Sequence, residues 1–158
     1  MLRWRSESSP GYSSRVTRFS RDTKVEALKR APLFEGLSRK QLGELAKVTE
    51  DVDFNAGKVL CREGQRGQEF FVIMDGEAEV TRNGKHLATC RSGDFFGEIS
   101  IIEDVPRSAT VIAKTPIRFF VLTRQSFLRL LDQQPDIERK VLRALAKRLM
   151  PVADDPTA

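Results

Sequence analysis

The hydrophobic residues of this chain recur with two different periods, and the change between them divides the sequence. Within residues 24–48, Val25 and Leu28 are spaced three apart, and Leu42 and Leu45 repeat that spacing. Residues three or four apart share one face of an α-helix. We therefore expect two short helices in this segment, separated by a turn.

From residue 57 onwards the period becomes two and turn residues become frequent. Glycines separate short apolar-rich runs such as KVLCRE, EFFVIM, EAEVTR and KHLATC, which is typical of antiparallel strands joined by turns. Asn83 and Gly84 form the clearest hairpin signal, because both accept the positive φ of a type I′ turn. The runs TVIAKT and IRFFVLT continue the pattern to residue 123. This predicts an antiparallel region of about eight short strands.

Capping residues and a proline mark the starts of further helices. Ser38, followed three residues later by Gln41, forms a capping box for the second N-terminal helix. Thr123 is expected to cap one helix and Pro135 to open the last one. That last helix has an apolar stripe at four-residue intervals, made of Ile137, Val141, Leu145 and Leu149.

Length and composition limit the class of protein. A chain of 158 residues can bury one good core but is short for two ordinary domains. Its 40% hydrophobic and 31% charged residues are typical of a soluble globular protein. We find neither the run of ~20 apolar residues of a transmembrane helix nor the apolar part of a signal peptide. Cys61 and Cys90 belong to no metal-ligand pattern, so we expect free thiols and a cytoplasmic protein.

The net charge of +5 comes mostly from the N-terminus. Residues 1–24 hold six basic and two acidic side chains, whereas the other 134 residues hold 21 and 20. We expect a basic, Ser- and Arg-rich, disordered tail over 1–23, a folded domain over 24–150 and a short tail over 151–158. The basic tail is interpreted as a solubilising arm. Contact with an acidic partner, a membrane surface or nucleic acid, and a transit peptide, are the alternatives.

The stretch GDFFGEISIIEDVPRSATV, residues 93–111, places Glu98 and Arg107 in an apolar context. The glycine before Glu98 suits the start of a short helix, whose first N–H groups attract an anion. The planar donors of arginine fit a phosphate, and a carboxylate beside them can accept a hydrogen bond from a sugar hydroxyl. These features describe a pocket for a sugar phosphate. A plain ion pair between Glu98 and Arg107 explains the same two residues equally well on these grounds.

The segment FGEISIIEDVPRSATV closely resembles the phosphate-binding cassette of cyclic nucleotide-binding domains. That family includes protein kinase A regulatory subunits, cyclic nucleotide-gated channels and bacterial catabolite activator proteins. Its other features occur in the same order: APLFEGLS, then EGQRGQEFFVIMDGEAEV, then the helix pair after FFVLTRQSF. The resemblance implies a mainly β fold, an eight-stranded antiparallel jelly-roll with N-terminal helices, a short cassette helix and a C-terminal helix pair.

Carried onto this sequence, the resemblance also implies a ligand site. Glu98 would accept a hydrogen bond from the ribose 2′-hydroxyl, and Arg107 would contact the cyclic phosphate. Serine at position 108 favours cAMP and still permits cGMP, because family members that hold guanine can carry threonine there. No metal or other cofactor is implied. The remaining implied ligand-binding residues are Phe96, Gly97, Ile99, Ser100, Ser108 and Ala109.

We therefore expect a regulatory module that binds cyclic nucleotide and converts binding into movement of its flanking helices, the last of which would close over the base. Eight residues follow that helix, too few for a DNA-binding module, so the effector is expected to be a separate protein. The alternative is a degenerate family member that serves protein interaction and binds no nucleotide. We expect no enzyme, because His86 is the only histidine and no P-loop or nucleophile motif occurs.

Overall fold

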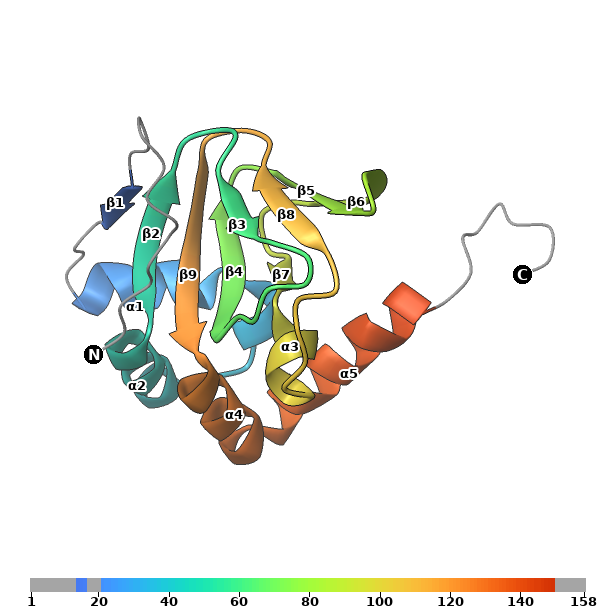
Figure 1. Cartoon of the computed structure of the whole chain (residues 1–158). Helices are drawn as coiled ribbons and strands as arrows, with labels where there is room; N and C mark the ends of the chain where they lie inside the picture. Colours follow the sequence, from blue (N-terminus) through green and yellow to red (C-terminus); the bar gives the residue numbers. More distant parts are fainter. Residues whose placement is uncertain (1–13, 17–20, 150–158) are drawn as a thin grey trace.

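The strands of the protein build two layers, with helices along one side of them (Figure 1). A computed structural model describes residues 14–16 and 21–149. The helices are α1 (Arg21–Lys29), η1 (Pro32–Phe34, a 3-10 turn), α2 (Arg39–Val48), α3 (Glu98–Ile102), α4 (Arg124–Gln133) and α5 (Pro135–Leu149). The strands are β1 (Ser14–Val16), β2 (Glu50–Phe54), β3 (Val59–Cys61), β4 (Glu69–Asp75), β5 (Ala78–Arg82), β6 (Lys85–Cys90), β7 (Phe95–Phe96), β8 (Thr110–Ala113) and β9 (Ile117–Thr123).

The strands pair into two antiparallel sheets. One sheet has the strand order β1-β2-β9-β4-β7, and the other has the order β3-β8-β5-β6. Most neighbours in each sheet are not consecutive in the chain, as the crossing connections of a jelly-roll require. The predicted β jelly-roll with flanking helices is confirmed, with eight strands between residues 50 and 123. The two sheets are not closed into a barrel.

Strand β1 lies in the 1–23 segment, for which we expected disorder. It pairs with β2, with Arg15 opposite Asp53, and the first helix begins at Arg21 instead of at residue 24. A strand here occupies the backbone N–H and C=O groups that β2 would otherwise leave unpaired at the sheet edge. Residues 1–13, 17–20 and 150–158 lie outside the described residues.

Strands β4 and β9 are buried on both faces and separate two apolar cores. Phe70 and Val72 belong to the core between this sheet and the helices, which we call the helix-side core. Phe71 and Ile73 belong to the core between the two sheets, which we call the sandwich core. Since side chains of a strand alternate between its faces, burial on both faces explains why EFFVIM is apolar without interruption.

Local signals in the sequence form the predicted caps and turn. Ser38 Oγ accepts from the Gln41 N–H at 3.1 Å, and Gln41 Oε1 accepts from the Ser38 N–H at 2.7 Å. Thr123 Oγ1 accepts a backbone hydrogen bond at 3.1 Å at the start of α4. Asn83 and Gly84 have φ values of 52° and 78°, the positive values of a type I′ turn.

Helix α5 begins at Pro135, as predicted, and buries part of its predicted stripe. Ile137 and Val141 are 1% and 2% exposed in the helix-side core. Leu145 packs against the same core from a partly buried position, and the Leu149 side chain lies outside the described residues. The stripe therefore attaches α5 to the other helices, on the side of the sheet opposite the sandwich core.

Lys140 adds polar contacts between α5 and the N-terminal helices. Lys140 Nζ donates to the carbonyl oxygens of Pro32 (3.1 Å), Leu33 (3.4 Å) and Glu35 (2.9 Å). Three acceptors match the three donors of an ammonium group.

Among residues 14–16 and 21–149, no helix combines the length and the hydrophobicity that crossing a membrane requires.

Candidate functional site

The cassette predicted from the sequence forms a short helix between two strands. Strand β7 ends at Phe96, Gly97 adopts a φ of 97°, and α3 begins at Glu98. A Cβ atom on Gly97 would lie 2.7 Å from the Glu69 carbonyl oxygen and 2.9 Å from Arg107 Nη1. Both the positive φ and this close approach require glycine at position 97.

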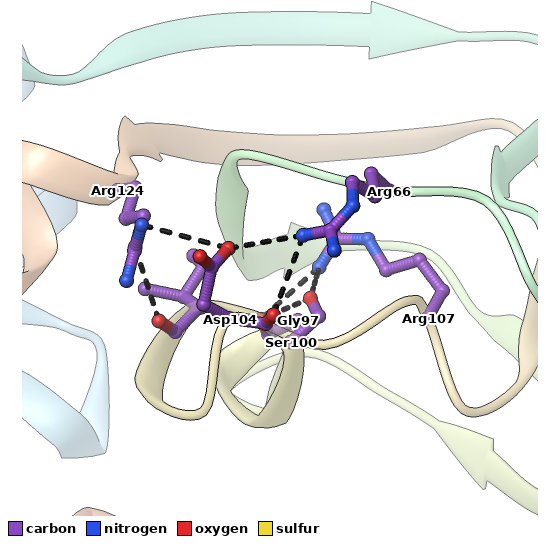
Figure 2. A network of polar contacts seen from close by, with 7 residues as sticks. Arg66, Gly97, Ser100, Asp104, Arg107 and Arg124 are labelled. Atoms are coloured by element: carbon purple, nitrogen blue, oxygen red, sulfur yellow. Dashed lines mark hydrogen bonds and ion pairs between the residues drawn. The ribbon is translucent and has the colours of Figure 1, made fainter.

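Arg107 is the buried centre of the site, with only 7% of its surface exposed. Its Nη1 donates to the Gly97 carbonyl oxygen at 3.0 Å and to Ser100 Oγ at 2.7 Å (Figure 2). Its Nη2 donates to the Glu69 carbonyl oxygen at 2.9 Å, and Glu69 Oε2 lies 3.4 Å away. A buried guanidinium of this kind is stable because hydrogen bonds and a carboxylate compensate its lost hydration.

A second glycine makes room for the guanidinium. A Cβ on Gly67 would lie 2.0 Å from Arg107 Nε and 2.2 Å from Cζ, closer than any normal contact. On the sandwich side, the guanidinium lies over the ring of Phe71 at 5.9 Å from the centroid. We call the enclosure formed by Gly67, Glu69, Gly97 and Ser100 the arginine pocket.

Glu98 is the most buried charged side chain of the cassette, at 1% exposure. Its Oε2 is a buried oxygen to which no described residue donates a hydrogen bond, although Glu98 makes other interactions. The carboxylate at ion-pair distance from Arg107 belongs to Glu69. A carboxylate from outside the cassette therefore takes part in holding this arginine.

The predicted site residues do not all lie inside the pocket. Phe96 is buried, and its ring stacks on Phe71 with centroids 4.6 Å apart. Ser100 is 4% exposed, whereas Ile99 is 38% exposed. Ser108 is exposed and uses its carbonyl oxygen to accept from Arg82 Nε at 2.8 Å. Ala109, which follows it, is partly buried.

Sequence reasoning missed Gly67 and Glu69 as members of the site. Both lie in the run EGQRGQEFF. The available signal was the charge of Glu69, which directly precedes the uninterrupted apolar run FFVIM. The thiol of Cys61 also lies close enough to Arg107 for the charge of the guanidinium to affect its pKa. Burial raises the pKa of Cys61 to about 12, although the positive charge of Arg107 acts in the opposite direction.

The structure also contains a cavity of about 500 Å³ that holds none of the predicted residues. It opens between α1, η1 and β4, and its lining includes Arg30, Met74 and Arg118. There, Arg118 donates hydrogen bonds to the Asp51 carboxylate, from Nε at 3.0 Å and from Nη2 at 2.6 Å.

Within the described ranges, no group of three or more His, Cys, Asp or Glu residues is arranged to hold a metal ion.

Comparison with known proteins identifies the family. The family model for the cyclic nucleotide-binding domain matches residues 51–134, more than half of the chain and all of the cassette. The chain belongs to the cyclic nucleotide-binding domain family.

Curated relatives include regulatory subunits of cAMP-dependent protein kinase. The chain is 37% identical to that of Schizosaccharomyces pombe over 118 residues, and 33% identical to that of Aspergillus niger over 125 residues. These alignments cover 74% and 77% of this chain but only 29% and 30% of the relatives. The chain therefore spans under a third of the length of the curated relatives it matches.

Solved structures of the same family superpose on most of the chain. A structure described as cAMP-bound PfPKA-R (141–441) gives a TM-score of 0.75 at 28% identity, covering 81% of this chain and 44% of that one. A structure described as Sp-2Cl-cAMPS bound to PKAR CBD2 gives a TM-score of 0.72 at 28% identity, covering 82% of this chain and 88% of that one. The regulatory subunit of a cAMP-independent protein kinase A from Trypanosoma brucei gives 0.63 at 25% identity, with coverages of 78% and 49%.

Proposed function

We propose that this chain is a regulatory module that binds a cyclic nucleotide, cAMP in preference to cGMP, without converting it. Binding is communicated to a separate effector protein by movement of the flanking helices. Because curated relatives are regulatory subunits of a protein kinase, a protein kinase is the first effector to test.

The observation that carries the proposal is the buried guanidinium of Arg107. Its Nη1 reaches two neutral acceptors, the Gly97 carbonyl oxygen and Ser100 Oγ. A phosphate oxygen at this position would provide a charged acceptor, and hydrogen bonds between two ionised partners are the stronger ones. The pocket thus presents an oriented positive group that a cyclic phosphate fits better than the protein's own neutral oxygens do.

Glu98 and Ser108 would determine which nucleotide binds. Glu98 is buried beside the arginine pocket, at 1% exposure, where a carboxylate can accept from a ribose hydroxyl but would repel a phosphate. Ser108 is exposed next to Arg107, at the position where family members that hold guanine can carry threonine. We therefore rank cAMP first and cGMP second.

A family member that regulates without cAMP is the second candidate. A structural relative of this chain is described as part of a cAMP-independent protein kinase A, so membership of the family does not by itself determine the ligand. The two candidates differ in a single measurable quantity, the affinity of the chain for cAMP.

Titration calorimetry on nucleotide-free protein separates these candidates. We expect wild-type protein to bind cAMP most tightly, cGMP less tightly, and 2′-deoxy-cAMP more weakly than cAMP because it lacks the hydroxyl that Glu98 would hold. Arg107→Ala should lower cAMP affinity by about two to three and a half decades, since it leaves charged groups without their cation.

Arg118→Gln is the matched control, because it removes a partly buried, carboxylate-paired arginine away from the cassette. It should leave cAMP affinity within about threefold of the wild-type value. Near-ultraviolet circular dichroism would establish that both variants are folded. Equal cAMP affinity in wild type and Arg107→Ala would place the phosphate elsewhere, and no detectable binding by folded wild type would favour the cAMP-independent candidate.

A further inference from the structure

A second polar network adjoins the arginine pocket and extends to helix α4 (Figure 2). Asp104 Oδ1 lies 3.3 Å from Arg66 Nη1 and 3.6 Å from Arg124 Nη1. Arg66 Nη1 also donates to the Asp104 carbonyl oxygen at 3.3 Å. Asp104 therefore lies between two guanidinium groups, one from the loop between β3 and β4 and the other from the first residue of α4.

The backbone at Asp104 would suit glycine better than aspartate. Asp104 follows the C-cap residue of α3, Glu103, and has a φ of 51°. Helices commonly end with glycine at this left-handed position, because a Cβ atom there is unfavourable. What aspartate adds over glycine is the carboxylate that contacts both Arg66 and Arg124.

Arg124 connects α4 to both parts of the site. Its backbone N–H donates to the Gln68 carbonyl oxygen at 2.7 Å, in the loop between β3 and β4. Its Nε donates to the carbonyl oxygen of Ile101, in α3, at 3.1 Å. The start of α4 is thus held by the cassette helix on one side and by the loop on the other.

The same loop is hydrogen-bonded to the backbone of Arg107. The Arg107 N–H donates to the Gln65 carbonyl oxygen at 2.8 Å, and the Gly64 N–H donates to the Arg107 carbonyl oxygen at 2.9 Å. A continuous set of contacts therefore runs from Arg107 through the loop and Asp104 to Arg124. Helix α4 in turn packs against α5.

We propose that Asp104 is a positioning residue that couples the cassette to α4. Its carboxylate holds α3, the β3–β4 loop and the start of α4 as one unit, so that a displacement of the cassette is passed to α4 and from there to α5. The part of this inference that involves ligand rests on the proposed function, whereas the mechanical coupling belongs to the ligand-free chain.

The bridge contributes to coupling more than to overall stability. The side chains of Arg66, Asp104 and Arg124 are 66%, 53% and 32% exposed. Ion pairs at such exposure contribute little to the free energy of unfolding and are screened by salt. Asp104→Gly removes the bridge but relieves the left-handed backbone, so the melting temperature should stay close to that of wild type. A purely structural role would instead predict a loss of stability.

The test is hydrogen exchange of the full chain, measured by mass spectrometry on wild type, Asp104→Asn and Asp104→Gly. Glu103→Gln is the matched control, since Glu103 is the adjacent exposed carboxylate and forms no ion pair with the described residues. Each protein is measured at low and high salt, without ligand and with saturating cAMP. Calorimetry on the same samples reports whether cAMP binds.

Without ligand and at low salt, we expect residues 98–106 and 124–133 to exchange about two- to tenfold faster together in both Asp104 variants than in wild type or Glu103→Gln. High salt screens the ion pairs, so it should raise the exchange rates of wild type to those of the Asp104 variants. With cAMP, the change in exchange that wild type shows over 124–149 should be at least halved in both variants, although they still bind the nucleotide.

Equal exchange of residues 124–133 in Asp104→Asn and Glu103→Gln at low salt would overturn the inference. So would a full cAMP-induced change in α4 and α5 in both Asp104 variants. If folded wild type bound no cAMP, the proposed function alone would fail, because the ligand-free measurements test the bridge by themselves.

Discussion

The place of the Arg107 side chain depends on two residues that have no side chain. Gly67 and Gly97 each leave a space that the guanidinium occupies, since a Cβ atom on either would lie within 3.0 Å of it. Four hydrogen-bond contacts to Gly97, Ser100 and Glu69 then hold the group in that space. An arginine held at so many points has lost most of its conformational freedom before any ligand arrives, which favours binding.

This arrangement predicts that Gly67→Ala weakens cAMP binding about tenfold or more, although the methyl group touches no nucleotide. The added Cβ would force Arg107 Nε and Cζ, at 2.0 and 2.2 Å, out of their observed positions. Calorimetric titration with cAMP measures the loss.

Gly64→Ala, in the same loop, is the control for backbone effects. Gly64 has a φ of 84°, and a Cβ atom added to it would meet no other atom within 4 Å. Alanine there should therefore cost about 1 kcal/mol of stability and leave affinity nearly unchanged. Equal affinity losses in the two variants would mean that loop strain, not the arginine position, governs binding.

At the scale of elements, α5 is attached to the fold by an apolar stripe and by one ammonium group. Lys140 reaches three carbonyl oxygens around η1, more than a hundred residues away in the chain. Closure of α5 over the base, as the family resemblance leads us to expect, would have to release these contacts. We call these three hydrogen bonds the Lys140 latch.

We predict that Lys140→Met speeds hydrogen exchange of α5 about tenfold in ligand-free protein, because hydrogen bonds to a charged donor are lost while the aliphatic length is kept. If release of the latch precedes binding, the apparent affinity for cAMP should rise in this variant, since the competent state becomes more populated.

Lys147→Met is the comparison, because Lys147 is an exposed lysine of the same helix and its ammonium group forms no hydrogen bond or ion pair with the described residues. Identical α5 exchange in the two lysine variants would show that Lys140 does not hold the helix. Faster exchange in Lys140→Met together with weaker cAMP binding would show instead that the latched state is the binding state.

At the scale of the whole molecule, one sheet connects the helices to the cassette. Strands β4 and β9 contribute alternate residues to the helix-side core and to the sandwich core, and β4 also carries Glu69 of the arginine pocket. A ligand bound at the pocket would therefore lie beside a strand that extends through both cores. Binding should stabilise the domain as a unit.

We accordingly predict that cAMP at about one hundred times its dissociation constant raises the melting temperature by roughly 5–10 °C. Linkage gives about 2.7 kcal/mol at that concentration, and 1 kcal/mol shifts a domain of this size by roughly 2–4 °C. Differential scanning calorimetry with cAMP and with AMP measures the shift. A shift of equal size with AMP, or an undiminished shift in Arg107→Ala, would contradict the assigned pocket.

The features that could be predicted from the sequence are those whose determinants lie close together in the chain. The capping box at Ser38, the hairpin turn at Asn83 and the start of α5 at Pro135 each depend on neighbouring residues. The cassette is also local, because Gly97, Ser100 and Arg107 lie within eleven consecutive residues and contact one another directly. Periodicity likewise indicated the apolar faces of the helices and the short strands.

The tertiary structure decided which distant groups complete the site. Glu69 lies 38 residues from Arg107 and reaches it only because β4 pairs with β7, directly before the cassette. The contact of Asp104 with Arg124, the attachment of α5 to η1 and the pairing of β1 with β2 likewise join separate parts of the chain. Periodicity and spacing describe each segment by itself. Which segments meet depends on the register of strands and the packing of two cores, and these are properties of the folded chain as a whole.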